Sequence, residues 1–435
     1  MYGAVVAAAD LRTGLLNAFR PPTSPPSTAS ILRSALWPIA ILSIIHRSYV
    51  LTSNGYITDD WAPVYRAARA FRAGVDVYNG RFDQVDPHYL YPPGGTLLMA
   101  PFGYIDSEFA ARNWFILFNT LAIIVAACLL VRLFRFPLTS VALPALLTAM
   151  FVTESVTNTL VFTNINGIIL LAEVLFLLWL LDGRANREWL AGIAIGLSLV
   201  VKPVLGVLLL LPLLNRQWRA LAAAIAVPVA FNAAAWPLVA DRMNFVNRTL
   251  PYIFSTRDYF NSSVLGNGVY YGLPMWLIIA LRVAFVVLAA GSLWLLYRYY
   301  RERDPLFWML TSSGVLLIAS WLVLSLAQGY YSMMLFPFLM TVVLPNSVLR
   351  NWPAWLATYG FLTMDRWLMW RWPTTGRFLE YMKITYGWSL MLVVVFCVLY
   401  FRYLDAKAAG RLTGATATGI DPPWMDEATR ERSAV

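Results

Sequence analysis

Residues 108–135 read EFAARNWFILFNTLAIIVAACLLVRLFR, a long apolar run that closes on Arg132 and Arg135. A helix needs about 20 apolar residues to cross the hydrocarbon core of a bilayer, and this run supplies them. Similar runs recur along the chain, and they are continuous, with no alternation of apolar and polar residues. The pattern predicts an all-α polytopic membrane protein that is embedded in a lipid bilayer.

The composition agrees with this prediction. Of the 435 residues, 59% are hydrophobic and 13% are charged, whereas about one quarter of a soluble domain is charged. The net charge of +10 comes mostly from basic residues at the ends of the apolar runs. Basic residues at these positions orient spans with their positive flanks in the cytoplasm, so we expect no nucleic-acid partner.

The order of apolar runs and basic flanks predicts about twelve crossings, with both termini in the cytoplasm. Residues 1–30 are expected to be a cytoplasmic tail, because arginines precede the first span. Residues 31–404 form the membrane domain, and the polar residues 405–435 are expected to be a disordered cytoplasmic tail. The expected crossings are residues 34–51, 108–131, 138–152, 165–181, two short spans within 189–214, 219–240, 273–297, 306–327, 332–345, 353–369 and 386–403.

Two loops are expected on the external face, residues 52–93 and residues 241–271. The first loop is followed by the apolar residues 94–105, which are too few to cross the bilayer. A re-entrant helix fits this length better.

The run 189–214 is interrupted by Lys202-Pro203 and has arginines on both sides. A single crossing would place one of these basic flanks outside, against the usual charge distribution. We therefore expect two short spans that form a hairpin, with Lys202 at its outer tip.

No nucleotide or cofactor motif is found in the sequence. There is no GxxxxGK[ST] and no GxGxxG after a strand, so an activated substrate is expected to arrive already activated, as a lipid. Cys128 and Cys397 lie inside apolar runs, and the only histidines are His46 and His88. We predict no cofactor and no metal centre, while a divalent ion at an Asp pair stays open.

Asp59 and Asp60 are adjacent carboxylates just after the first span. Either residue could be solvated or could cap the helix that residues 64–71 suggest. In a membrane enzyme that transfers a sugar, a carboxylate in this position would be the general base for the acceptor hydroxyl. The residues alone leave these alternatives open.

Other polar residues near the external ends of spans have two interpretations each. Lys202 could mark a turn with its side chain reaching the interface, or could face a phosphate group. Asn164 and Asn166 could cap a helix or hold sugar hydroxyls. Tyr330 and the Arg/Trp group at residues 366–372 could belong to an interfacial belt, and the group could instead clamp phosphate and sugar.

Together these pieces resemble the actinobacterial polyprenyl-phosphate-sugar-dependent glycosyltransferases of the GT-C class, the family of the polyprenyl-phosphomannose α-(1→2)-mannosyltransferases. The motifs that carry the resemblance are Asp60-Trp61, Tyr65, Ala67-Ala68-Arg69, Gly74, Tyr78, Tyr91-Pro92-Pro93, Thr163-Asn164-Ile165-Asn166 and Lys202-Pro203. The late external turn, residues 328–331, lacks the His that the family often carries there. A His-assisted role therefore cannot be transferred to this chain.

Within the family, the whole chain looks most like the members that branch arabinan through α-(1→3) linkages. This resemblance implies transfer of D-arabinofuranose from decaprenyl-phosphate β-D-arabinofuranose to the 3-hydroxyl of arabinan in arabinogalactan and lipoarabinomannan. The reaction would take place at the periplasmic face of the plasma membrane. A polyprenyl-phosphomannose-dependent α-mannosyltransferase is the alternative, and a lipid or sugar transporter is a more distant one.

The resemblance also implies roles for individual residues. A β-linked donor and an α-linked product mean inversion, for which one base is enough, and this base is expected to be Asp60, with Asp59 second. Lys202, Arg366 and Arg371 would stabilise the departing polyprenyl phosphate. The residues expected to contact sugar or acceptor are Tyr65, Tyr91, Asn164, Asn166, Gln328 and Tyr330.

Overall fold

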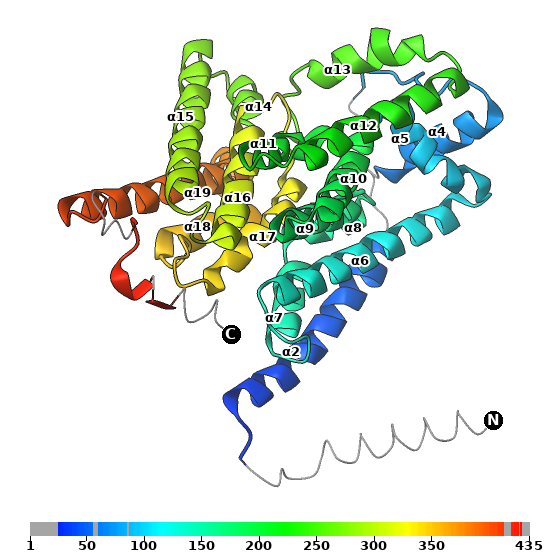
Figure 1. The fold of residues 1–435 in the computed structure, drawn as a ribbon. Coiled ribbons are helices and arrows are strands. Elements are labelled where there is room, and N and C mark those ends of the chain that lie inside the picture. The colour runs from blue at the N-terminus through cyan, green and yellow to red at the C-terminus, as the bar shows by residue number, and fades with distance from the viewer. Residues whose placement is uncertain (1–24, 55–59, 85–86, 413–418, 426, 429–435) are drawn as a thin grey trace, which may run out of the picture.

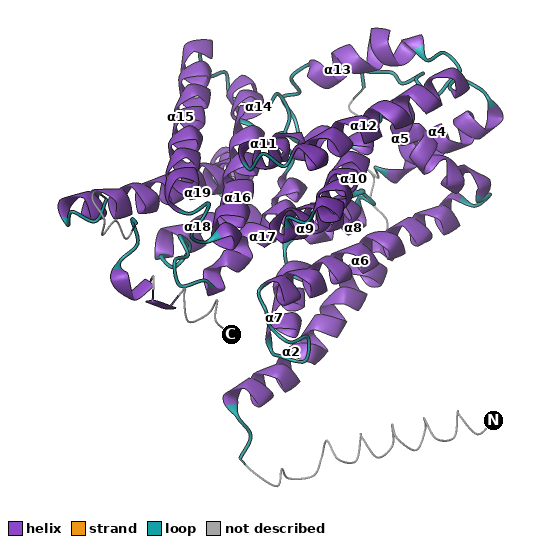
Figure 2. Cartoon of the chain, viewed as in Figure 1, coloured by secondary structure: helices purple, strands orange, loops and turns teal. Residues whose placement is uncertain are grey.

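The computed structural model describes residues 25–54, 60–84, 87–412, 419–425 and 427–428. Within these ranges the regular structure is entirely helical and contains no strand (Figure 2). The all-α prediction is therefore confirmed. Most of the N-terminal tail predicted over residues 1–30 lies outside the described residues, as does Asp59.

The α-helices carry the labels of Figure 1, and η marks the 3-10 and π helices, which the figure does not label. In chain order they are α2 (Thr28–Ile45), η1 (His46–Val50), α3 (Leu51–Ser53), α4 (Trp61–Ala73), α5 (Pro93–Met99), η2 (Ala100–Tyr104), α6 (Glu108–Leu133), α7 (Ala142–Phe151), α8 (Glu154–Val161), α9 (Asn166–Asp182), α10 (Ala185–Val201), η3 (Pro203–Leu209), α11 (Leu210–Leu214), α12 (Trp218–Ala235), η4 (Trp236–Leu238), η5 (Phe245–Thr249), α13 (Leu250–Phe254), α14 (Val264–Tyr270), α15 (Met275–Tyr299), α16 (Pro305–Val323), η6 (Gly329–Leu335), α17 (Phe336–Leu339), η7 (Met340–Val343), α18 (Trp352–Leu362) and α19 (Pro373–Ala408).

Six helical segments of the described chain are long and apolar enough to cross a membrane, which supports the prediction of a polytopic membrane protein. They are Thr28–Ser53, Glu108–Leu133, Trp218–Leu238, Met275–Tyr299, Pro305–Val323 and Pro373–Ala408. Other expected crossings correspond to shorter helices, such as α9 and α10 with 17 residues each. The count of twelve crossings stays a prediction.

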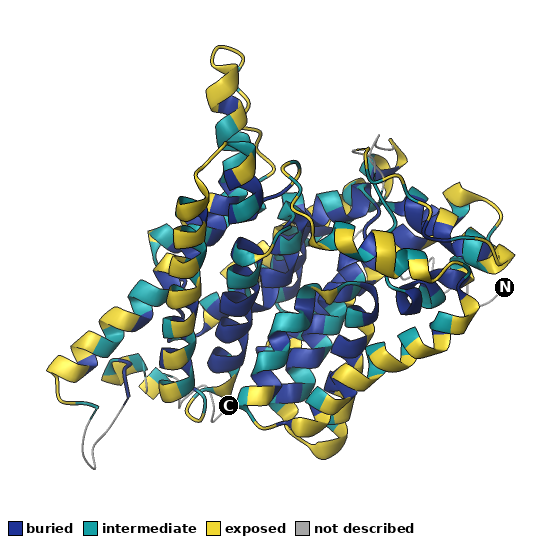
Figure 3. Ribbon diagram, turned by 90° about the horizontal axis from the view of Figure 1, so that it is seen from above, coloured by how far each residue is buried: buried dark blue, intermediate teal, exposed yellow. Residues whose placement is uncertain are grey.

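The interior is formed by the central helices. Figure 1 shows α2, α6 and α7 on one side, α15, α18 and α19 on the other, and α8 to α12 between them. Buried residues concentrate in the middle of this arrangement (Figure 3). Of the most apolar stretch of α16, 78% is buried, against 6% for Thr28–Ser53. The apolar side chains exposed on the outer helices would therefore face lipid.

Close approach of backbones holds the central helices together. A Cβ atom on Gly192 of α10 would lie 2.2 Å from the carbonyl oxygen of Ala220 in α12, so only glycine fits at this contact. Small residues let membrane helices pack closely, where dispersion contacts replace the hydrophobic effect between helices.

The predicted hairpin within residues 189–214 is present. α10 ends at Val201, Lys202 has extended backbone angles, and η3 starts at Pro203. The residue before a proline is pushed out of the helical region, which explains why the helix stops here. Glu188 at the start of α10 and Asn215 after α11 line the same cavity, so the chain reverses its direction between these two arms of the hairpin.

Several boundaries late in the chain differ from the prediction. α18 has only 11 residues and ends at Leu362, rather than continuing to residue 369. α19 begins at Pro373, well before the crossing predicted over residues 386–403. The crossing predicted at residues 332–345 is a run of short 3-10 and α turns from Gly329 to Val343.

The predicted disordered tail also differs in its described part. α19 continues to Ala408, and Ile420 and Asp421 are buried. Asp421 forms an ion pair of 3.1 Å with Arg402 and accepts a hydrogen bond from the hydroxyl of Tyr300. These contacts of Asp421 form only when the chain is folded, so the composition of the tail could not predict them.

Candidate functional site

Asp60 stands at the start of α4, but its carboxylate does not cap this helix. Its backbone N–H donates to the carbonyl of Phe162 at 2.9 Å, which ties the start of α4 to the end of α8. The next residue, Trp61, is 1% exposed, and its ring lies 4.5 Å from that of Phe115. The capping interpretation of Asp60 is therefore wrong, and the buried Trp61 anchors the chain beside Asp60.

Asn164 connects Asp60 with Lys202. Its Nδ2 donates to the Asp60 carboxylate at 2.6 Å, and its Oδ1 accepts from Lys202 Nζ at 2.7 Å. Only the amide nitrogen can donate to a carboxylate, and only the amide oxygen can accept from an ammonium, so the orientation of the amide is determined by its two partners. The Asp60 carboxylate and the Lys202 ammonium are thus held on either side of one amide group.

A tight turn between α8 and α9 places Asn164. Thr163, with φ of 55°, adopts the left-handed conformation that β-branched residues rarely adopt, and the N–H of Asn164 donates to Thr159 at 2.8 Å. α9 then starts at Asn166, and Gly167 packs so closely on α6 that a Cβ would lie 2.8 Å from the carbonyl oxygen of Asn119. Strain of this kind is characteristic of functional sites.

Lys202 lies at the tip of the hairpin, outside its two helical arms, and reaches into the same cluster. Its Nζ also donates to Asn166 Oδ1 at 3.4 Å, and it sits over the rings of Tyr330 and Tyr331 at 5.5 and 5.8 Å. Burial lowers the pKa of Lys202 to about 8, and the charge of Asp60 opposes this change. A lysine of this kind is a compact positive charge that is poorly hydrated and available to an anion.

Tyrosine and glutamine side chains complete the cluster. The hydroxyl of Tyr330 lies 3.4 Å from Asn164 Nδ2 and donates to Gln328 Oε1. Tyr91 is 9% exposed, and burial, together with the charge of Asp60, raises the pKa of its hydroxyl. Asn164, Asn166, Gln328 and Tyr330, four of the predicted sugar-contacting residues, are therefore joined by hydrogen bonds to this group, and Tyr91 is close enough to feel the charge of Asp60.

Tyr65 uses its hydroxyl in backbone contacts outside this group. Its hydroxyl donates to the carbonyls of Ile105 and Asp106, at 2.7 and 2.9 Å. Tyr65 therefore holds α4 against the loop before α6. Its contact with sugar stays a prediction.

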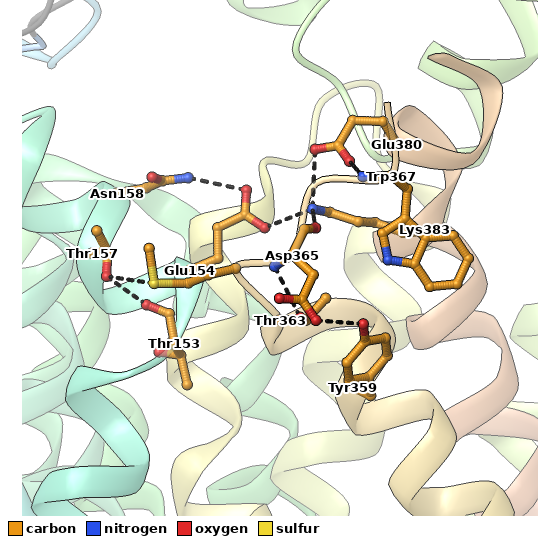
Figure 4. Close-up of polar contacts among 11 residues, drawn as sticks. Thr153, Glu154, Thr157, Asn158, Tyr359, Thr363, Asp365, Trp367, Glu380 and Lys383 are labelled. Carbon is orange, nitrogen blue, oxygen red and sulfur yellow. Dashed lines mark hydrogen bonds and ion pairs between the residues drawn. The ribbon is translucent and has the colours of Figure 1, made fainter. Parts of the chain in front are cut away.

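Arg366 and Arg371 are exposed on the loop between α18 and α19. Figure 4 shows how this loop is fastened: Lys383 of α19 contacts Glu154, Glu380 and the carbonyl of Asp365 at 3.0–3.1 Å. In the described part of the chain, no hydrogen bond or ion pair joins either arginine to the Asp60–Asn164–Lys202 cluster. The loop is thus ordered, but these two side chains are not part of the cluster.

Two arginines that the sequence analysis did not select lie near the cluster. Arg257, in the loop between α13 and α14, exerts an electrostatic effect on Tyr330 and Tyr331. Arg112 of α6 is buried and donates to the carbonyl of Val161 at 3.0 Å, beside the residue that binds the N–H of Asp60. Arg257 follows no motif, whereas Arg112 could have been noticed as a charge inside an apolar run.

No group of three or more His, Cys, Asp or Glu side chains that could hold a metal ion occurs among the described residues. The arrangement can nevertheless accept a proton at a carboxylate and stabilise a negative charge at an ammonium. These are the two requirements of a displacement with a phosphate leaving group.

The comparisons with known proteins agree with this chemistry. The glycosyltransferase family 87 profile matches residues 89–325, a range that includes Tyr91, Asn164 and Lys202. A protein of Mycolicibacterium smegmatis is 72% identical over 434 residues, covering 100% of this chain and 99% of the relative. Proteins of Mycobacterium tuberculosis (71% over 430 residues, 98% of both chains) and Corynebacterium glutamicum (43% over 394 residues, 90% of this chain and 93% of the relative) are also similar.

All three relatives are named α-(1→3)-arabinofuranosyltransferase. No solved structure matches the chain. The matching family profile covers more than half of the sequence, and the relatives align over nearly all of it. The chain belongs to glycosyltransferase family 87.

Proposed function

We propose that this chain is an α-(1→3)-arabinofuranosyltransferase that branches arabinan in arabinogalactan and lipoarabinomannan. The observation that carries the proposal is the pairing of Asp60 and Lys202 across Asn164. The relatives that are 71–72% identical and bear this name supply the identity of the sugar. The proposed donor is decaprenyl-phosphate β-D-arabinofuranose, and the proposed acceptor is the 3-hydroxyl of an arabinan chain.

The proposed mechanism is a single inverting displacement. The oxygen of the acceptor hydroxyl attacks the anomeric carbon of the donor while Asp60 removes the proton of this hydroxyl. At the same time the bond between the anomeric carbon and the phosphate oxygen breaks. The electron pair of this bond stays on decaprenyl phosphate, whose growing charge Lys202 stabilises. Asn164 keeps the base and the cation in a fixed relation, which provides the preorganisation that catalysis needs.

Further cations and hydroxyl groups surround these two residues. Arg257 is proposed as a second positive charge for the donor phosphate, because its field reaches Tyr330 and Tyr331 beside Lys202. Arg366 and Arg371 would meet the lipid phosphate only if it extends toward the loop between α18 and α19. Tyr91, Asn166, Gln328 and Tyr330 are proposed to contact the sugar and the acceptor.

The site is proposed to face the periplasm from the plasma membrane. Lys202 lies at the tip of its hairpin, and the other ends of the arms carry Arg184, Arg187 and Arg216. Basic flanks favour the cytoplasm, so the tip and the cluster around it would be external. A polyprenyl-linked sugar reaches this side with its phosphate at the interface.

The test uses the purified chain with decaprenyl-phospho-arabinofuranose and a short α-(1→5)-linked arabinan, followed by linkage analysis. The wild type should form 3-linked branches, and Asp60→Asn should lower turnover by roughly 100-fold or more, the range for loss of a general base. Asp106→Asn is the matched control, because Asp106 is an exposed carboxylate of the same region that pairs with Arg69.

Two results would contradict different parts of the proposal. Full turnover by Asp60→Asn would contradict the role of Asp60 as the general base, while the proposed reaction would still stand. Consumption of polyprenyl-phosphomannose in place of the arabinose donor by the wild type would overturn the sugar assignment.

A further inference from the structure

A cavity of about 500 Å³ lies at the other end of the central helices. It is bounded by the end of α9, the start of α10, the end of α11 and the junction of α15 and α16. α9 starts at Asn166 in the candidate site and has 17 residues, so the cavity is about 25 Å away from that site. A headgroup bound in this cavity is therefore well separated from the Asp60–Asn164–Lys202 cluster.

Three charged side chains line the cavity: Arg216, Arg301 and Glu188. Arg301 is held in place by Tyr297, whose hydroxyl accepts from its Nη1 at 2.9 Å, and its Nη2 pairs with the exposed carboxylate of Glu302 at 2.8 Å. The side chain of Arg216 makes no hydrogen bond or ion pair with any residue that the structure describes. The nearby carboxylate of Asp182 is already bound to Arg184, at 2.7 Å. The cavity is thus lined by the Arg216 guanidinium, which has no partner among the described residues, by the Arg301 guanidinium, which shares its charge with the solvent-exposed Glu302, and by the carboxylate of Glu188.

Arg216 has a side chain at a backbone position that favours glycine. Its φ is 59°, the left-handed conformation, and Gln217 N–H donates back to Pro212 at 2.8 Å. This is the helix-ending turn in which glycine is usually found, because other residues are strained there. Arg135 ends α6 in the same way, with φ of 61°, but does not line the cavity. The pair gives a matched comparison between a cavity arginine and an equivalent arginine elsewhere.

The side chains that line the cavity indicate which class of ligand it could bind. Two guanidinium groups suit a phosphate, which they can bind through charge-assisted hydrogen bonds. Glu188 would repel a second anionic group but would accept hydrogen bonds from an ammonium group. Leu181 and Met309 form part of the wall and suit the first carbons of an acyl chain. The cavity lies among helix ends rich in arginine, where the headgroup region of a bilayer is expected.

We propose that this cavity binds the headgroup of a phospholipid that carries both a phosphate and a primary amine. The phosphate lies between Arg216 and Arg301, and the ammonium group faces Glu188. The bound lipid would brace the hairpin of α10 and α11 against α15 and α16, at the end of the molecule opposite to the transfer site.

The test measures lipid binding to the purified full chain in detergent by native mass spectrometry. The lipids are phosphatidylethanolamine, phosphatidylglycerol and phosphatidylcholine with identical acyl chains. The wild type should prefer phosphatidylethanolamine, because phosphatidylglycerol lacks the amine and phosphatidylcholine has no N–H group. Arg216→Gly should weaken this binding about tenfold, and Arg135→Gly should leave it unchanged. Glu188→Gln should weaken phosphatidylethanolamine binding and spare phosphatidylglycerol.

Arg216→Gly also shows whether a loss of lipid binding is caused by a loss of stability. Glycine relieves the left-handed backbone, so this variant should unfold at the same temperature as the wild type or higher, measured without added lipid. Equal loss of binding in Arg216→Gly and Arg135→Gly, or phosphatidylglycerol binding as tightly as phosphatidylethanolamine in the wild type, would overturn the proposal. Free phosphoethanolamine that competes at the same concentration as the lipid would overturn the assignment to a lipid.

Discussion

At the scale of single residues, Asn164 links groups that the sequence presents far apart. Asp60, Asn164, Lys202 and Tyr330 could each be selected from the sequence, because each is a polar residue at the predicted external end of an apolar run. Their contacts could not be predicted, since they depend on how α8, α9 and the hairpin tip pack. Arg257 could not be selected at all, because an arginine in a polar loop has no distinguishing pattern.

The charge of Lys202 should make donor use sensitive to pH. Its pKa is lowered to about 8, so the ammonium form dominates below this value and is lost above it. We expect kcat/KM for the lipid donor to fall as the pH rises through about 8. A bound phosphate favours the charged lysine, so kcat should fall only at higher pH.

Lys202→Arg provides the control for this pH profile, because arginine stays charged throughout the range. In this variant the decline near pH 8 should disappear, even if overall activity is lower. A decline at the same pH in Lys202→Arg would assign it to another group.

At the scale of elements, the sequence predicted the interrupted hairpin correctly and the end of α18 wrongly. The hairpin follows from Lys202-Pro203 and from arginines on both flanks, two signals with a direct physical cause. Beyond Leu362 the sequence remains rich in Trp, Leu and Met, so composition gives no reason to end a helix there. The helix ends because Lys383 and Glu380 of α19 hold the following residues as a loop.

The contact between α10 and α12 should not tolerate a larger residue at Gly192. A methyl group there would overlap the carbonyl of Ala220, at 2.2 Å. Overpacking of this kind costs about 1–3 kcal/mol, so Gly192→Ala should lower the midpoint of thermal unfolding in detergent by several degrees.

Gly206→Ala is the matched control, because its nearest neighbour would be a Leu199 methyl group at 3.8 Å, an ordinary contact. This variant should unfold at the wild-type temperature. Similar unfolding temperatures for both variants would mean that α10 and α12 can separate without loss of stability.

At the scale of the whole molecule, different groups of residues lie at the two ends of the central helices. One end holds the cluster of Asp60, Asn164 and Lys202, and the other holds the cavity and the tail residue Asp421. The basic flanks predict that Lys202 and the C-terminal tail lie on opposite sides of the membrane, and this orientation stays a prediction. The docking of the tail could not be predicted, since it rests on one carboxylate that finds Arg402 and Tyr300 only after folding.

Asp421 should therefore stabilise the fold without affecting sugar transfer. Its side chain is 8% exposed, and that of Arg402 is 12% exposed, so Asp421→Ala would leave a buried arginine and the hydroxyl of Tyr300 without their shared acceptor. The loss should be about 3 kcal/mol. We expect earlier thermal unfolding and faster proteolytic cleavage after residue 408, with transfer activity at low temperature close to that of the wild type. Asp405 is an exposed carboxylate on α19, the helix that carries Arg402, so Asp405→Asn should change neither stability nor cleavage. Cleavage of Asp421→Ala at the wild-type rate would show that residues 419–421 are held by other contacts, of which the hydrogen bond from Arg411 to the carbonyl of Asp421 is the first to test.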